Sequence, residues 1–196
     1  MQNQQILEAG ITQLVILDRD GVVNTERSDY VKSAAEWQPI EGSIAAIADL
    51  YRAGFTVVIA TNQSGLAREK FDLDDLEAMH AKFTQLVEDA GAELGAIFYC
   101  PHKPEDNCYC RKPKAGLVEA IEAEFNASAQ GRPFIGDSLR DLQAGLIKGC
   151  IPYLVKTGNG LKTLEEIRSA EDFDHTKVKV FDDLAAAAQD IIKNAL

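Results

Sequence analysis

The sequence of 196 residues contains no long apolar run, and none approaches the roughly 20 residues that a membrane-spanning helix requires. Its N-terminus, MQNQQILEAG, also lacks the basic head and apolar middle of a secretion signal. These two absences predict a cytoplasmic location without a membrane partner. In that compartment the four cysteines are expected to stay reduced, so disulfides are not expected.

Basic residues are also scarce. The chain has 20 Lys and Arg against 31 Asp and Glu, which gives a formal net charge of −11. Nucleic acids and anionic membranes bind to basic surfaces, so this composition argues against both as partners. It does not argue against a small anionic substrate, because a metal ion and a few local cations can hold such a ligand.

Internal repeats, low-complexity tracts and linker-like stretches are absent, so residues 1–196 are expected to form a single domain. The phosphate-binding motif GxxxxGK(S/T) is missing as well, which disfavours a P-loop nucleotide enzyme. What is present is the composition of an ordinary globular protein, 46% hydrophobic and 26% charged. Nothing in it requires more than a monomer.

Short apolar segments alternate with amphipathic ones along the chain. The strands are expected at 13–17, 55–60, 96–100, 133–136, 151–155 and 177–181. The helices are expected at 43–53, 72–90, 115–125 and 139–148 and in the alanine-rich C-terminal segment. This alternation predicts an α/β fold with a mostly parallel sheet that helices cover on both faces.

Polar or reactive residues stand at four of the expected strand ends. They are Asp18, Thr61, Cys100 and Asp137. Ligands bind to parallel sheets beyond the carboxyl ends of the strands, so these residues are expected to converge at one edge. Taken alone, each is also compatible with an ordinary turn or with a helix cap.

The segment Asp18-Arg19-Asp20-Gly21 follows the first expected strand. A carboxylate with a second carboxylate two residues on can act as a nucleophile with a neighbouring acid/base. Attack on phosphorus requires the phosphoryl charge to be neutralised, and hard cations such as Mg²⁺ prefer oxygen ligands. Asp137 and Asp141, one helical turn apart, could supply such ligands, and Lys112 could supply a local cation.

A second metal site is predicted in the loop at 100–110. Its four candidate ligands are Cys100, His102, Cys108 and Cys110. Three cysteines with one histidine form a closed tetrahedral zinc site, which leaves no position for a substrate. The zinc is therefore expected to stabilise the loop. Because the loop ends in Arg111 and Lys112, the zinc would also place two cations beside the aspartates.

Together these motifs resemble those of the haloacid-dehalogenase-type phosphatases over roughly residues 14–160. The matching residues are Asp18-x-Asp20-Gly21, Thr61, Lys112 and Gly136-Asp137-x-x-x-Asp141. The resemblance implies a three-layer Rossmann-like fold and phosphomonoester hydrolysis through an aspartyl-phosphate. It implies that Asp18 is the nucleophile and that Asp20 is the general acid toward the leaving alcohol and then the base for water.

The same resemblance implies the ligands of both the cation and the phosphoryl group. Mg²⁺ would be held by Asp18, Asp137 and the backbone carbonyl of Asp20, with Asp141 supporting them from behind. Thr61 and Lys112 would bind the transferring phosphoryl group.

Two families in this superfamily carry a similar zinc loop, the heptose bisphosphate phosphatases and the histidinol-phosphate phosphatases. The chain is more similar to the former, because it has Ser64 where the histidinol enzymes tend to have Asp. This implies removal of the 7-phosphate of D-glycero-D-manno-heptose 1,7-bisphosphate, in the synthesis of ADP-heptose for the lipopolysaccharide core. The five-residue spacer between His102 and Cys108 is usual for the histidinol type, which stays an alternative.

A third alternative is a non-catalytic zinc-loop binding module whose aspartates only cap helices. For the enzyme, the short connections after Asn24 and Thr61 leave no room for a large cap domain, so loops are expected to recognise the substrate. Arg111 is expected to bind the distal phosphate at C1, since an arginine can grip a phosphate with two hydrogen bonds. The other expected substrate contacts are Asn24, Glu26, Arg27, Ser28, Asp29, Tyr30, Asn62, Gln63 and Ser64. His80 is expected to be structural or to face solvent.

Overall fold

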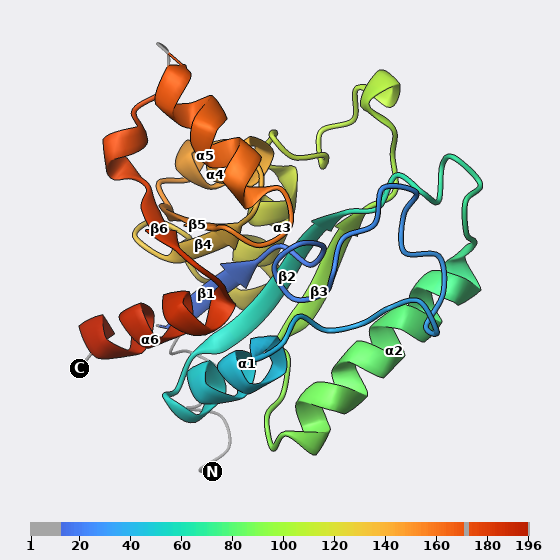
Figure 1. Cartoon of the computed structure of the whole chain (residues 1–196), viewed down its shortest axis with the longest axis horizontal. Helices are drawn as coiled ribbons and strands as arrows, with labels where there is room; N and C mark the ends of the chain where they lie inside the picture. Colours follow the sequence, from blue (N-terminus) through green and yellow to red (C-terminus); the bar gives the residue numbers. More distant parts are fainter. Residues whose placement is uncertain (1–12, 171–172, 196) are drawn as a thin grey trace.

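The computed structural model describes residues 13–170 and 173–195. Its sheet is centred on β1 (Leu14–Leu17), all four residues of which are buried. β1 pairs in parallel with β2 (Thr56–Asn62) on one side and with β4 (Pro133–Gly136) on the other. The strand order is β3-β2-β1-β4-β5-β6, with β3 at Ala96–Cys100, β5 at Ile151–Val155 and β6 at Lys179–Phe181. All five pairings are parallel, so every strand directs its carboxyl end to the same edge (Figure 1).

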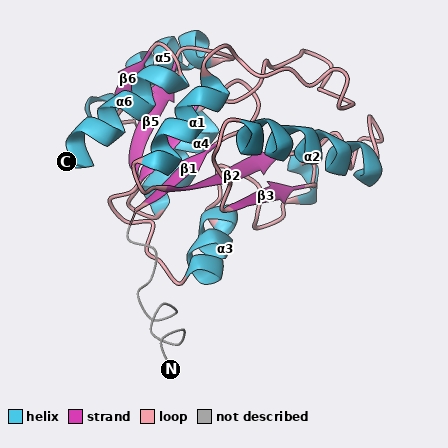
Figure 2. Ribbon diagram, turned by 90° about the horizontal axis from the view of Figure 1, so that it is seen from below, coloured by secondary structure: helices cyan, strands magenta, loops and turns pink. Residues whose placement is uncertain are grey.

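Helices cover both faces of this sheet. Their bounds are Ser43–Arg52 (α1), Leu73–Asp89 (α2), Gly116–Phe125 (α3), Leu139–Ile147 (α4), Gly160–Ser169 (α5) and Leu184–Ala195 (α6). Alternate residues of β1 point to opposite faces. Val15 and Leu17 pack in one apolar cluster with α1, α2 and α6, whereas Leu14 and Ile16 pack in another with α3 and α4. Figure 2 shows α2 and α3 on opposite sides of β2 and β3.

The start of α2 shows how the sequence sets a helix boundary. The Asp72 carboxylate accepts a hydrogen bond from the Asp75 amide at 2.9 Å, and the Asp75 carboxylate accepts one from the Asp72 amide at 3.2 Å. This capping box satisfies two amides that would otherwise have no partner. From there Leu76, Met79 and Phe83 form the buried stripe of the helix.

The predicted fold class is confirmed, and most predicted boundaries fall within two residues of the observed ones. Two differences stand out. α5 was not predicted, because its sequence GLKTLEEIRS is mostly polar and buries only Gly160, Thr163 and Ile167. The last strand is shorter than the predicted 177–181, since Lys177 belongs to a 3-10 turn at His175–Lys177.

As predicted, the described residues form no large cap over the edge where the carboxyl ends of the strands lie. Residues 18–42 between β1 and α1, and residues 63–72 between β2 and α2, contain only loops, turns and isolated bridges. Recognition at this edge therefore depends on loops. Among residues 13–170 and 173–195, no helix is long and apolar enough to cross a membrane.

Candidate active site

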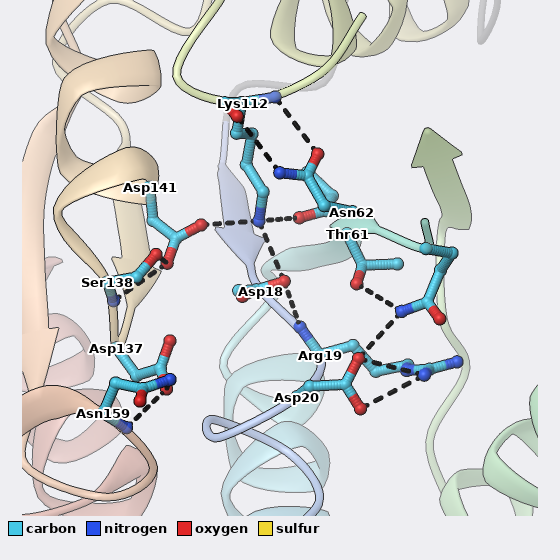
Figure 3. A network of polar contacts seen from close by, with 12 residues as sticks. Asp18, Arg19, Asp20, Thr61, Asn62, Lys112, Asp137, Ser138, Asp141 and Asn159 are labelled. Atoms are coloured by element: carbon cyan, nitrogen blue, oxygen red, sulfur yellow. Dashed lines mark hydrogen bonds and ion pairs between the residues drawn. The ribbon is translucent and has the colours of Figure 1, made fainter. Parts of the chain in front are cut away.

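Three carboxylates and one lysine meet where β1 and β4 end (Figure 3). The Lys112 ammonium lies 2.9 Å from Asp18 Oδ1 and 2.6 Å from Asp141 Oδ1, and it donates to the carbonyl of Ala60 at 2.6 Å. The Lys112 side chain is only 2% exposed. Asp137 follows β4 and accepts a hydrogen bond from the Asn159 amide at 2.8 Å. Of the four residues expected to converge at this edge, Asp18 and Asp137 therefore meet here, together with Lys112, whereas Cys100 belongs to the zinc loop.

The carboxylates of this cluster are crowded. Burial and the neighbouring charge of Asp141 raise the pKa of Asp18 to about 7, although Lys112 acts in the opposite direction. Burial and the charges of Asp18 and Asp141 raise the pKa of Asp137 to about 8. Burial alone would lower the pKa of Lys112, but the two paired carboxylates raise it above its ordinary value. The single positive charge of Lys112 is thus too small to balance three carboxylates.

The arrangement fits a hard cation. Asp18, Asp137 and Asp141 each offer an oxygen within 4.8 Å of the others. Asp141 Oδ2 already accepts from the amide and the hydroxyl of Ser138, at 3.0 and 2.6 Å, and its Oδ1 faces Lys112. Asp18 Oδ2 and Asp137 Oδ1 have no hydrogen-bond partner in the described residues, so these two oxygens could bind Mg²⁺.

Two glycines make room beside Asp137. Gly21 and Gly158 both have positive φ angles, of 82° and 56°. A Cβ atom at either position would overlap the Asp137 carboxylate. Close approach of the backbone explains why only glycine fits at both positions.

The raised pKa values predict a pH-dependent response to magnesium. Between the ordinary carboxyl pKa of 3.8 and the folded values of about 7 and about 8, the folded state binds more protons than the unfolded chain. Stability of the metal-free protein should therefore fall as the pH rises through this window. Because Mg²⁺ requires deprotonated ligands, it should raise the melting temperature more at about pH 8 than at about pH 6.

Thermal melts with and without MgCl₂ at both pH values would measure this response. Asp137→Asn serves as the control, since it should weaken both the pH dependence and the magnesium effect. A magnesium effect that is equal at the two pH values would contradict the prediction.

Asp20 lies in a separate set of hydrogen bonds. Its Oδ1 accepts from Asn24 Nδ2 at 2.9 Å, and its Oδ2 accepts from Gln63 Nε2 at 2.8 Å. Arg19 Nη2 donates to both oxygens, at 3.1 and 3.0 Å. Burial would raise the pKa of Asp20, but the Arg19 charge and the donors lower it below its ordinary value.

Two expected substrate contacts form hydrogen bonds to other active-site residues. Asn24 is fully buried and bonds to Asp20, so it does not face the cavity. Asn62 lines the cavity, but its amide also exchanges two hydrogen bonds of 3.1 Å with the backbone of Lys112. Gln63 Nε2 donates to Thr61 Oγ1 at 2.9 Å, which links the end of β2 to Asp20.

A cavity of about 290 Å³ opens beside Asp20. Most of the expected substrate contacts line it: Glu26, Arg27, Ser28, Tyr30, Asn62, Gln63, Ser64 and Arg111. Asp29 does not, because it faces Lys32 and Lys70 at 3.2 and 3.1 Å. Arg140, from the first turn of α4, lines the same cavity and was not predicted.

The zinc loop brings its four candidate ligands together. Cys100 Sγ lies 3.6 Å from Cys108 Sγ, 3.2 Å from Cys110 Sγ and 3.6 Å from His102 Nδ1. Sulfurs bound to one tetrahedral zinc ion lie about 3.8 Å apart, so the donor set and spacing fit zinc. The His102 carbonyl accepts from Arg111 Nη1 at 3.0 Å, so the loop also orients that arginine.

Replacing Cys108 with Ser should remove most of the bound zinc and lower the free energy of unfolding by more than about 2 kcal/mol, since loss of a structural metal is among the large effects. Zinc content by atomic absorption and urea denaturation would test this. Cys150→Ala is the matched control, because Cys150 is buried outside the loop and should not affect zinc content. A Cys108 variant with full stability and no zinc would refute a structural role.

Several site residues were missed by sequence reasoning. Asn159 follows β5, at the end of a predicted strand, so the rule that places ligands beyond strand ends is the signal that indicates it. Arg140 lies three residues after Asp137, one helical turn from a predicted site residue. Arg19 stands between the two aspartates, yet no local pattern indicates that its side chain is buried.

Comparison with known proteins places this geometry in a family. The profile of the family described as "Polynucleotide kinase 3 phosphatase" matches residues 13–176. The chain is 49% identical over 180 residues to the D-glycero-beta-D-manno-heptose-1,7-bisphosphate 7-phosphatase of Pseudomonas putida, covering 92% of this chain and 99% of that protein. It is 51% identical over 181 residues to the enzyme of the same name from Neisseria meningitidis, covering 92% and 95%.

A solved structure agrees with these sequence relatives. The crystal structure of D,D-heptose 1,7-bisphosphate phosphatase from B. bronchiseptica, complexed with magnesium and phosphate, superposes with a TM-score of 0.87. It is 47% identical in sequence, and the match covers 93% of this chain and 99% of that one. By sequence and by structure, the chain belongs to the D-glycero-beta-D-manno-heptose-1,7-bisphosphate 7-phosphatase family.

Proposed function

We propose that this protein is a Mg²⁺-dependent phosphatase that removes the 7-phosphate of D-glycero-D-manno-heptose 1,7-bisphosphate, within the synthesis of ADP-heptose for lipopolysaccharide. The observation that carries the proposal is the buried cluster in which Lys112 bridges Asp18 and Asp141 next to Asp137. Relatives that share about half of the sequence carry the corresponding name. Helix capping alone would not require a buried lysine between the two carboxylates, which disfavours a binding module.

The residues suggest a two-step reaction. An oxygen of Asp18 attacks phosphorus, and the bond from phosphorus to the sugar oxygen breaks while protonated Asp20 donates its proton to that oxygen. Since Arg19 keeps the pKa of Asp20 low in the protein alone, the nearby negative charge of the bound phosphate would have to raise that pKa for Asp20 to carry the proton. Water then attacks the phosphorus of the aspartyl-phosphate and gives a proton to Asp20, which frees the Asp18 carboxylate. Mg²⁺ held by Asp18, Asp137 and the Asp20 carbonyl would neutralise part of the phosphoryl charge. The side chains of Lys112 and Thr61 would bind the phosphoryl oxygens.

The substrate would bind in the cavity beside Asp20, with its distal phosphate near Arg111 and Arg140. Neither arginine forms an ion pair within 4.0 Å in the described residues, although Glu26 lines the same cavity. Burial and the charge of Arg140 lower the pKa of Arg111, as expected for two nearby cations. A second phosphate would relieve that repulsion.

Arg111→Ala should therefore lower kcat/KM for the bisphosphate about 100-fold, since hydrogen bonds to charged groups contribute about 1.5–3 kcal/mol. A heptose 7-monophosphate, which lacks the distal phosphate, should lose much less. Steady-state phosphate release with both substrates measures the difference, and Arg52→Ala, at an exposed arginine of α1, is the control. Equal losses on the two substrates would exclude this role.

The proposal is tested by comparing kcat/KM for heptose 1,7-bisphosphate and histidinol phosphate with the same purified protein and MgCl₂. A preference for the heptose of about 100-fold or more, equal to about 2.7 kcal/mol, would support it. The reverse preference would favour the histidinol-phosphate alternative, and no phosphate release from either would favour a binding module. A cytoplasmic location, a monomeric state and a single domain over residues 1–196 remain predictions.

A further inference from the structure

Arg19 is a buried cation between the two candidate catalytic carboxylates. Its side chain is 1% exposed, and its backbone amide donates to Asp18 Oδ1 at 2.8 Å while its guanidinium binds both oxygens of Asp20. Its carbonyl accepts from the amides of Val23 and Asn24, at 2.8 and 3.1 Å, which fixes the backbone at this residue. One residue therefore orients Asp18 through its main chain and Asp20 through its side chain.

A buried guanidinium needs more than one partner to hold a fixed orientation, because it presents five N–H donors in a plane. In the described part of the chain, only Asp20 and His80 accept hydrogen bonds from the Arg19 side chain. Arg19 Nη1 donates to His80 Nε2 at 3.2 Å, and Arg19 Nε has no partner. Loss of His80 would leave a second buried donor unsatisfied and release one end of the guanidinium.

His80 is suited to this contact. Since an arginine can only donate, His80 Nε2 accepts and the imidazole proton is on Nδ1. Burial and the adjacent charge of Arg19 lower the pKa of His80 to about 4, so the ring is neutral at neutral pH. The residue comes from the middle of α2, which Asp72 caps and whose Met79 and Phe83 are buried in the core. The acceptor is thus attached to a rigid element.

We propose that His80 is a positioning residue for the acid/base: through Arg19, it holds the Asp20 side chain in the position from which, once protonated, it gives its proton to the leaving oxygen. This inference rests on the proposed function, in which Asp20 donates that proton. His80 itself lies outside the cavity beside Asp20 and does not contact the reacting atoms.

The proposed role has a signature that a merely structural residue would lack. A sugar alkoxide is a poor leaving group and needs the Asp20 proton as the bond to phosphorus breaks. The phenolate released from 4-nitrophenyl phosphate is stable without a proton. Because kcat/KM covers only the steps up to release of the alcohol, a misplaced Asp20 should slow the sugar substrate much more than the aryl phosphate.

The experiment measures kcat/KM for both substrates with wild type, His80→Leu and His80→Gln. His80→Leu should lose about 10- to 100-fold on heptose 1,7-bisphosphate, part of the roughly 100- to 10,000-fold that general acid–base catalysis contributes. On 4-nitrophenyl phosphate it should stay within about threefold. His80→Gln carries an acceptor of similar reach, so it should recover most of the loss. Equal losses on both substrates, or no loss on the sugar, would overturn the proposal.

Two further variants keep the test decisive. In an Asp20→Asn background, His80→Leu should cause no additional loss on the sugar, because residues that act as a unit are not additive. If His80→Leu does not fold, the activities of His80→Asn and His80→Gln are compared in its place. Both side chains are amides, and only the longer one reaches Arg19. Thr84→Leu, one turn further on the same face of α2, is the control for changes to the helix.

Failure of this inference can be told apart from failure of the proposed function. If Asp18→Asn retained turnover, the phosphatase mechanism itself would be wrong. If Asp18→Asn were inactive and His80→Leu reduced both substrates alike, only the positioning role of His80 would be wrong.

Discussion

Replacing Asp18 with Asn is expected to abolish turnover, with a loss in kcat of at least about a thousandfold, as for other nucleophiles that form covalent intermediates. The amide has nearly the same shape as the carboxylate but cannot form the acyl phosphate. The fold should survive, because the change removes one of three crowded acidic groups and keeps an oxygen that can accept from Arg19. Phosphate release with heptose 1,7-bisphosphate and MgCl₂ measures the loss.

A direct test of the covalent step would follow transfer of labelled phosphate to the protein. Wild type should carry the label transiently, whereas Asp18→Asn should carry none. Asp174→Asn, at an exposed aspartate of the surface, is the control and should behave as wild type. More than a few per cent of residual turnover in Asp18→Asn would refute the nucleophile assignment.

The second large effect is expected at Lys112, in both activity and stability. Lys112→Met keeps the length of the side chain but leaves Asp18 and Asp141 without their cation. Removing one partner from a buried ion pair costs about 3–5 kcal/mol, because the remaining charge is uncompensated. Since Lys112 is also expected to bind the phosphoryl group, kcat should fall by about 100-fold or more.

Urea denaturation of Lys112→Met at two pH values would separate this cause from simple loss of packing. The uncompensated carboxylates can take up protons, so the loss of stability should be smaller at about pH 5 than at about pH 8. Lys177→Met, at an exposed lysine, should change neither stability nor activity appreciably. A loss that does not vary with pH would mean that Lys112 contributes mainly by filling space.

Much of the site could be predicted because the strand-end rule converts positions far apart in the chain into neighbours. Asp18 and Asp137 are more than a hundred residues apart, yet both follow strands that pair directly in the sheet. The zinc loop could also be predicted from the sequence, because its four candidate ligands fall within residues 100–110. In both cases the local pattern and the regular geometry of a parallel sheet were sufficient.

The parts that were not predicted depend on side-chain direction across elements. Nothing near His80 in sequence indicates that its ring meets Arg19, since that contact depends on how α2 lies over the sheet. Asn24 was expected to face the sugar, but the turn after β1 directs its side chain inward to Asp20. α5 was missed because its polar sequence carries little of the apolar periodicity on which helix prediction depends.

The opposite edge of the sheet offers a way to immobilise the enzyme on a solid support. Near the end of α6, Asn194 and Ala195 share a cavity of about 410 Å³ with residues at the starts of strands, among them Pro133, Ile151 and Lys179. The candidate catalytic residues follow the other ends of the strands, at the far edge (Figure 1). A tether attached after α6 should therefore orient each molecule with its active edge toward the solution, so that a bound layer keeps its access to substrate.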